Sequence, residues 1–214
     1  MNLKSYLSNT QKRIAMPIMT HPGIEYIGKR VIDAVTDGDV HFEAIRAVVE
    51  RYNMAACTVI MDLTVEAEAF GAKINFPENE VPHVIERLVA DEASVSSLKV
   101  PDLTAGRLPE YLKANQRAVA YFQDRPVLAG CIGPFSLAGR LYDMSEIMVA
   151  IYIEPDTILQ LLEKCTTFLL AYCRRLKEIG VSGVFMAEPA AGLLSDEDCC
   201  TYSIAFVKRI VDEL

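Results

Sequence analysis

Short apolar runs alternate along the chain with longer stretches that have helical periodicity. Four of these runs are typical of buried strands, because each is a continuous apolar stretch of strand length. They are Arg13–Met19, Cys57–Met61, Pro126–Ile132 and Gly183–Ala187. After each run, apolar residues recur at spacings of three and four, as on one face of an amphipathic helix. This repeated order predicts parallel strands joined by helical crossovers, and hence an α/β protein.

Several residues mark where the helices begin and end. Asp39 is expected to be the N-cap of the first long helix, and another helix is expected to start at Pro109. The clearest helix carries a seven-residue apolar stripe from Ile158 to Ile179 and is expected to end at Gly180. Ser195, with an acidic residue three positions later, predicts the start of the last helix.

The choice between an open sheet and a closed barrel depends on a motif that is missing. An open sheet that binds a nucleotide would carry a glycine-rich phosphate loop after an early strand, and the sequence contains neither G-x-G-x-x-G nor G-x-x-x-x-G-K-[ST]. We therefore favour a (β/α)8 barrel, which commonly needs about 250 residues. The chain has 214 residues and four β/α units, so its length lies just below that of a complete barrel.

Composition narrows the function classes. The 29 acidic residues outnumber 21 lysines and arginines, which gives a net charge of -8 and excludes the basic surface that nucleic acid needs. The most apolar stretch, residues 126–139, is interrupted by glycine and proline, and the start of the chain shows no secretory signal. We expect no membrane span and a cytoplasmic location. The six cysteines form no C-x-x-C pair and are expected to be reduced thiols, of which Cys57, Cys131, Cys165 and Cys173 are expected to be packing residues.

Candidate chemistry lies at the ends of the apolar runs, because barrel active sites form at the carboxyl ends of the strands. Two carboxylates and a histidine at one mouth could do acid/base work, bind a metal or stabilise a cation. The candidate catalytic residues are Asp62 and Glu188. The candidate substrate-binding residues are His21, Gly133, Pro134, Phe135 and Arg140.

These candidates also have structural interpretations. Asp62 could cap the turn that follows its strand, and His21 could be an ordinary turn residue in His-Pro-Gly. Arg140 is either a surface helix residue or a clamp for an anionic substrate. Glu66 and Glu68 lie on a short predicted helix, and we expect them to form a solvated face.

Three segments together resemble the central blocks of the uroporphyrinogen decarboxylase superfamily. They are Asp62–Gly71, Gly130–Gly139 and Gly180–Ser195. The resemblance extends from Arg13 to Leu214 and implies a barrel of eight β/α units, of which this chain holds about four. The resemblance therefore implies that residues 1–214 are the N-terminal part of one barrel domain. Half a barrel would leave two sheet edges open, so we expect self-association through the exposed surfaces.

Two chemistries compete within this superfamily. The decarboxylases carry an arginine-rich segment after the first strand that binds the carboxylates of a tetrapyrrole, and the corresponding Met16–Glu25 has no arginine. Thr64–Glu68 and Gly133–Leu137 resemble instead the methyltransferase branch, which moves a methyl group between a corrinoid and a thiol such as coenzyme M. We expect methyl transfer first, uroporphyrinogen decarboxylation as the alternative, and a catalytically silent half-barrel with a binding or assembly role as a third possibility.

The resemblance also implies roles and cofactors. In the decarboxylases, the aspartate that matches Asp62 stabilises a protonated pyrrole, with no cofactor. In the methyltransferases, zinc held by a His-x-Cys pair and a later cysteine binds the thiol, and a corrinoid protein is a partner. This chain has no His-x-Cys, so its complete protein would have to supply the zinc site. Glu188 would be an auxiliary ligand at most, and we expect the chain alone to be inactive.

Overall fold

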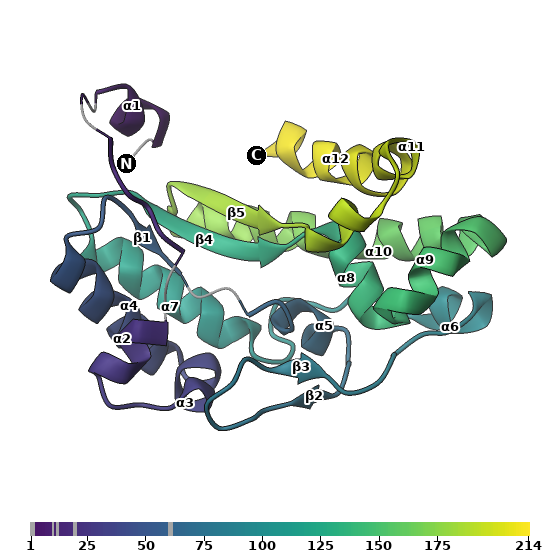
Figure 1. Cartoon of the computed structure of the whole chain (residues 1–214), viewed down its shortest axis with the longest axis horizontal. Coiled ribbons are helices and arrows are strands. Elements are labelled where there is room, and N and C mark those ends of the chain that lie inside the picture. Colours follow the sequence, from purple (N-terminus) through teal and green to yellow (C-terminus); the bar gives the residue numbers. More distant parts are fainter. Residues whose placement is uncertain (1–2, 10, 12, 19–20, 60–61) are drawn as a thin grey trace.

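Three parallel strands form the central sheet of the computed structural model, which describes residues 3–9, 11, 13–18, 21–59 and 62–214. In the described part, the strand order is β1 (Cys57–Thr58), β4 (Val127–Ile132), β5 (Gly183–Ala187). Cys57 pairs with Val127, and Leu128 pairs with Gly183. The prediction of parallel strands joined by helices is confirmed, and all three carboxyl ends lie at the same edge of the sheet (Figure 1).

The first predicted strand is wrong over residues 13–18, and Met19 lies outside the described residues. Residues 13–18 are irregular and pair with no described strand. Ile14 and Ile18 are exposed, so this segment lacks the burial that its apolar pattern suggested. Pro17 has no N–H to give to a ladder, and its carbonyl oxygen accepts a hydrogen bond from the Thr58 hydroxyl at 3.2 Å, which is a side-chain bond and not part of a ladder. Ile60 and Met61, the end of the second predicted strand, also lie outside the described residues.

Long amphipathic helices cover the sheet. α4 (Gly38–Tyr52) packs against α7 (Leu108–Tyr121), α7 contacts α10 (Pro155–Ile179), and α10 in turn contacts α12 (Ala205–Glu213). The longest helix, α10, buries its predicted stripe, apart from the half-buried Ile179, and contacts β5. It ends at Gly180, which has a left-handed backbone with φ of 95°, as the sequence predicts.

The helix starts agree with the sequence with one exception. Pro109 lies in the first turn of α7, and Ser195 caps α11 (Asp196–Cys199) by accepting a hydrogen bond from Asp198 N. The N-cap of α4 is Asp37, not Asp39, because the Asp37 side chain accepts from the N–H groups of residues 39 and 40. The prediction was therefore two residues late.

Shorter elements complete the fold. An antiparallel hairpin, β2 (Ile74–Asn75) and β3 (His83–Val84), has no counterpart among the predicted strands. The remaining helices are α1 (Leu3–Ser8), α2 (His21–Tyr26), α3 (Val31–Thr36), α5 (Val65–Ala69), α6 (Glu92–Ser97), α8 (Pro134–Tyr142), α9 (Met144–Ile153), the 3₁₀ turn η1 (Pro189–Leu193) and the π turn η2 (Cys200–Ile204). None of the described helices has both the length and the apolar content that crossing a membrane requires.

Candidate functional site

The ends of β4 and β5 are joined by the carboxylate of Glu188. Its Oε1 accepts a hydrogen bond from Phe135 N at 2.7 Å, and its Oε2 accepts one from Ser136 N at 2.9 Å. Ser203 adds a contact of 3.3 Å from its hydroxyl to Oε1. These two N–H groups belong to the first turn of α8, where the helix dipole favours negative charge. Glu188 therefore fastens the end of β5 to the start of α8.

Gly133 allows this close approach. A Cβ atom at this position would lie 2.4 Å from the Glu188 carboxyl carbon, so any side chain here would force that carboxylate to move. Burial raises the pKa of Glu188, and the hydrogen bonds from Ser136, Phe135 and Ser203 oppose that rise. Of the residues predicted to bind substrate, Gly133, Pro134 and Phe135 thus lie beside Glu188. The ring of Phe135 is fully buried, so only its backbone faces the carboxylate.

Asp62 lies at the same edge of the sheet, after β1, and its side chain is 1% exposed. Its Oδ1 accepts from Thr64 N at 3.0 Å and from the Thr64 hydroxyl at 2.6 Å. Its Oδ2 is 2.5 Å from Arg107 Nη1 and 3.3 Å from the Tyr111 hydroxyl. Both carboxylate oxygens are therefore occupied within the protein.

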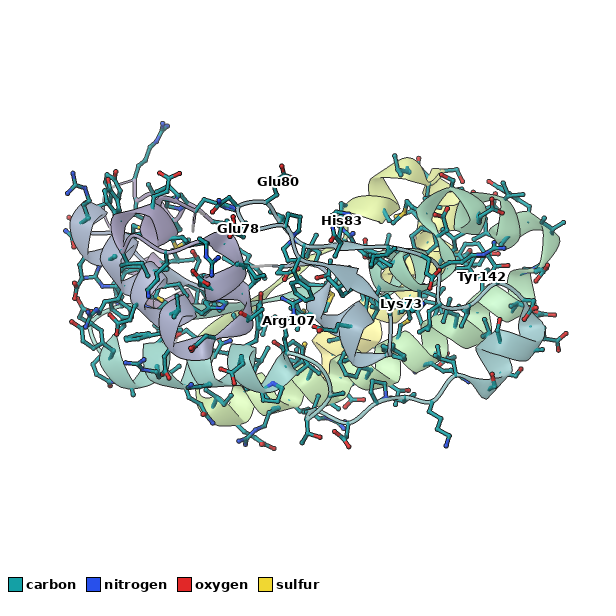
Figure 2. The ribbon with its side chains drawn as sticks, turned by 90° about the horizontal axis from the view of Figure 1, so that it is seen from below. Lys73, Glu78, Glu80, His83, Arg107 and Tyr142 are labelled. Atoms are coloured by element: carbon teal, nitrogen blue, oxygen red, sulfur yellow. The ribbon has the colours of Figure 1, made fainter. Side chains whose placement is uncertain are left out.

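Arg107 is the main residue that the sequence analysis missed. It is the residue before α7 and lies in the middle of the molecule (Figure 2). Besides Asp62, it donates to Glu68 Oε2 at 2.6 Å, to the Thr64 hydroxyl at 2.9 Å and to the Val35 carbonyl oxygen at 3.1 Å. Its guanidinium carbon lies 4.7 Å from the centre of the Phe76 ring. A single arginine in a loop is not part of any sequence pattern. The residues that it contacts therefore could not be predicted from the spacing of residues along the chain.

Glu66 corrects another expectation. It is 3% exposed, and so does not belong to a solvated face. Its Oε1 accepts from Ile132 N at 3.0 Å, at the end of β4. Burial raises the pKa of Glu66 to about 7, although the Ile132 N–H opposes this. Glu68 is half-buried and paired with Arg107. The short helix α5 is enclosed because it contacts both α7 and α8.

His21 and Arg140 lie apart from this cluster. His21 is the exposed first residue of α2, which packs beside α4 (Figure 1). Arg140, in the last turn of α8, lines a cavity of about 170 Å³ together with Arg87 and Asp143. Their roles in substrate binding stay predictions.

The residues present do not fit a zinc site. In the described ranges, no three side chains of the His, Cys, Asp or Glu type are grouped so that they could hold a metal ion. Glu188, the predicted auxiliary ligand, has both oxygens committed to N–H groups of α8. The cysteines of the strands and of α10 are free and buried, as predicted, and burial raises the pKa of Cys57 to about 12.

Comparison with known proteins adds relatives of two kinds. A methylcobamide:CoM methyltransferase, MtbA, of Methanosarcina mazei is 30% identical over 163 residues, which cover 74% of this chain and 48% of the relative. A uroporphyrinogen decarboxylase of Polaromonas sp. is 27% identical over 186 residues, or 84% of this chain and 50% of the relative. The chain therefore spans about half the length of these curated relatives.

The fold has a solved counterpart. A methyltransferase from Methanosarcina mazei superposes with a TM-score of 0.87 at 21% identity, covering 98% of this chain and 65% of that chain. The profile of the uroporphyrinogen decarboxylase family (URO-D) matches residues 12–214. Since this match includes every strand of the central sheet and the Asp62, Glu66 and Glu188 cluster, the chain belongs to the uroporphyrinogen decarboxylase family.

Proposed function

We propose that this chain is part of a methyltransferase that moves a methyl group between a corrinoid and a thiol such as coenzyme M. Two methylcobamide:CoM methyltransferases, from Methanosarcina mazei and Methanosarcina acetivorans, are each 30% identical to it over about three quarters of its length. In such a transfer the thiolate sulfur attacks the methyl carbon, and the electron pair of the broken cobalt–carbon bond stays on cobalt.

The choice of methyl transfer over decarboxylation rests on the hydrogen bonds that Asp62 already makes within the protein. A carboxylate that stabilises a cation formed from a substrate must offer that cation at least one free oxygen. Here Thr64 occupies Oδ1, and Arg107 and Tyr111 occupy Oδ2. Arg107 would have to leave a buried ion pair before Asp62 could meet a protonated pyrrole. The arrangement therefore suits a positioning role for Asp62 better than a decarboxylase role.

The charges around the strand ends support the same choice. Asp62, Glu66 and Glu188 are acidic, and the guanidinium of Arg107 is already shared by Asp62 and Glu68. A tetrapyrrole that carries several carboxylates needs basic partners, and residues 16–25 contain no arginine. Coenzyme M carries a single sulfonate, so it needs fewer basic partners than a tetrapyrrole with several carboxylates.

In the proposed enzyme, this chain supplies the N-terminal half of the barrel, about four of its units. Its residues fix the geometry of the mouth: Glu188 holds the start of α8, and Arg107 holds the turn after β1. Zinc, which the resemblance implies, would need ligands from the rest of the complete protein, because the residues described here do not fit it.

Decarboxylation of uroporphyrinogen is the second candidate. Relatives with that name are 25% to 27% identical to this chain, and Asp62 lies at the strand end where the decarboxylase role would place it. A silent half-barrel with a binding or assembly role is the third.

One assay separates the three candidates. The protein is expressed from its complete reading frame and supplied with zinc, and its action on methylcobalamin plus coenzyme M is compared with its action on uroporphyrinogen. We expect methylated coenzyme M, and a change in the cobalamin absorbance, with no release of carbon dioxide. Decarboxylation without methyl transfer would contradict the proposal, and inactivity on both substrates would favour the silent half-barrel.

A further inference from the structure

A small cavity with polar walls lies between the turn after β1, strand β4 and helix α10. Its volume is about 10 Å³, which is close to the lower limit for one water molecule. The residues that line it are Asp62, Leu63, Val65, Glu66, Tyr111, Gly130, Cys131, Ile132 and Tyr172. The four that carry oxygen in their side chains are all buried.

Two of these side chains reach the cavity with hydrogen-bonding capacity to spare. Tyr172 is 1% exposed, and its hydroxyl has no hydrogen-bond partner among the residues that the structure describes. The Glu66 carboxylate accepts from Ile132 N through Oε1 and also from its own backbone N–H, and Oε2 has no partner in any other described residue. A buried polar group left without a partner costs about 1–3 kcal/mol. Internal water commonly satisfies such groups when the site is polar and has room for it.

We infer that this cavity is the binding site of a single internal water molecule, which bridges the Glu66 carboxyl group and the Tyr172 hydroxyl. Tyr111, which also lines the cavity, donates a long hydrogen bond of 3.3 Å to Asp62. The water molecule thus lies beside Asp62 and joins three elements, α5, α7 and α10, at the carboxyl ends of the strands. This site does not depend on which reaction the protein catalyses.

The charges that face Glu66 are consistent with such a site. Asp62 and Arg107 approach it from the loops, Tyr111 from α7, Cys131 from β4 and Tyr172 from α10. Burial raises the pKa of Glu66 to about 7 and keeps the pKa of both tyrosines well above its usual range. Both hydroxyls therefore stay neutral, and below about pH 7 Glu66 holds a proton that it can donate to the water.

The experiment counts long-lived internal water in solution by magnetic relaxation dispersion of the water oxygen nucleus. The purified chain is compared with Glu66→Gln and Glu66→Leu, and circular dichroism checks that each variant is folded. Glu66→Gln keeps the shape and polar atoms of the side chain, whereas Glu66→Leu makes that wall of the cavity apolar. Glu80→Gln, at an exposed acid between β2 and β3, is the matched control.

The chain, Glu66→Gln and Glu80→Gln are expected to share the same dispersion amplitude, and Glu66→Leu to lose the equivalent of one water molecule. An unchanged amplitude in folded Glu66→Leu would overturn the inference. Should that variant fail to fold, a high-resolution crystal structure of the unmodified chain decides. Density for one water within hydrogen-bond distance of Glu66 and Tyr172 supports the site, and an empty or closed cavity overturns it.

Discussion

At the scale of single residues, the burial of Glu66 makes stability depend on pH. Its pKa is about 7 in the folded protein and about 4.5 when exposed, so between these values the folded state keeps a proton that the unfolded chain has lost. The contribution of this group to the unfolding free energy is therefore fully present below about pH 4.5 and is lost as pH rises through 7. Its size is about 1.4 kcal/mol for each unit by which the folded pKa exceeds the unfolded pKa.

Replacing Glu66 by Gln should remove this dependence. Urea unfolding at about pH 5 and about pH 8 is expected to show a smaller loss of unfolding free energy in Glu66→Gln than in the unmodified chain, by a few kcal/mol. The comparison is needed because burial also raises the pKa of Glu188. Glu80→Gln should behave like the unmodified chain. Equal losses in Glu66→Gln and the unmodified chain would contradict the burial of Glu66.

Arg107 provides the second prediction at this scale. Arg107→Met leaves Asp62 buried without its counter-ion and should lower the unfolding free energy by about 3–5 kcal/mol. Arg107→Lys should lower it by less, because lysine keeps the charge but not the planar fork that reaches Asp62, Thr64 and Glu68 together.

Two further variants test whether the loss of stability in Arg107→Met comes from the unpaired Asp62 carboxylate. Arg175→Met removes an exposed ion pair with Glu178 and should cost about 1 kcal/mol or less. Adding Asp62→Asn to Arg107→Met should recover part of the loss, because the unpaired charge is gone. If Arg107→Met lowers the unfolding free energy no more than Arg175→Met does, the buried ion pair between Arg107 and Asp62 does not stabilise the site.

The location of a site residue was predicted correctly from the sequence where it follows directly from the end of a strand. Asp62, Gly133 and Glu188 follow apolar runs, so parallel pairing brought them to one edge. Sequence reasoning failed for Glu66 and Arg107, because their surroundings come from helices distant in sequence. In the Val-Glu-Ala-Glu-Ala segment of α5, acidic residues alternate with apolar ones, and nothing local indicates that α7 and α8 enclose it.

At the scale of elements, the contact between β5 and α8 depends on Gly133. Its φ of -87° suits any residue, so Gly133→Ala would cause no backbone strain. The added Cβ would instead push the Glu188 carboxylate off the N–H groups of Phe135 and Ser136. We expect a loss of about 1–3 kcal/mol in unfolding free energy, measured by denaturant titration.

Gly192→Ala is the matched control, because a Cβ there meets nothing within 4 Å. Its cost should be within about 0.5 kcal/mol of zero. In a background of Glu188→Ala, the cost of Gly133→Ala should shrink, since the clashing carboxylate is absent. An equal cost in both backgrounds would show that Gly133 does not act through Glu188.

Helices and strands with a long apolar pattern were predicted better than those with a short one. The stripe of α10 continues for seven apolar residues, and the helix and its end at Gly180 were both placed correctly. The run at residues 13–18 has the same apolar character over a short length, yet Ile14 and Ile18 are exposed and the run joins no described strand. The two-residue strands β2 and β3 are too short to show any periodicity.

At the scale of the whole molecule, β5 has a strand neighbour on one side only within the described sheet. All five of its residues are only half-buried, and a groove of about 520 Å³ lies between its start, α10 and α12. An open strand edge invites pairing with another chain. The isolated chain should therefore self-associate, which size-exclusion chromatography with light scattering would show as a dimer or larger species. A monodisperse monomer would count against an open half-barrel.

The central claim is that the protein moves methyl groups rather than decarboxylating a tetrapyrrole. The most direct measurement is the ratio of the two activities in one preparation of the protein from its complete reading frame. We predict that coenzyme M is methylated by methylcobalamin and that uroporphyrinogen is left unchanged, with Asp62 held by Arg107. Release of carbon dioxide from uroporphyrinogen, with no methylation of coenzyme M, would contradict the account.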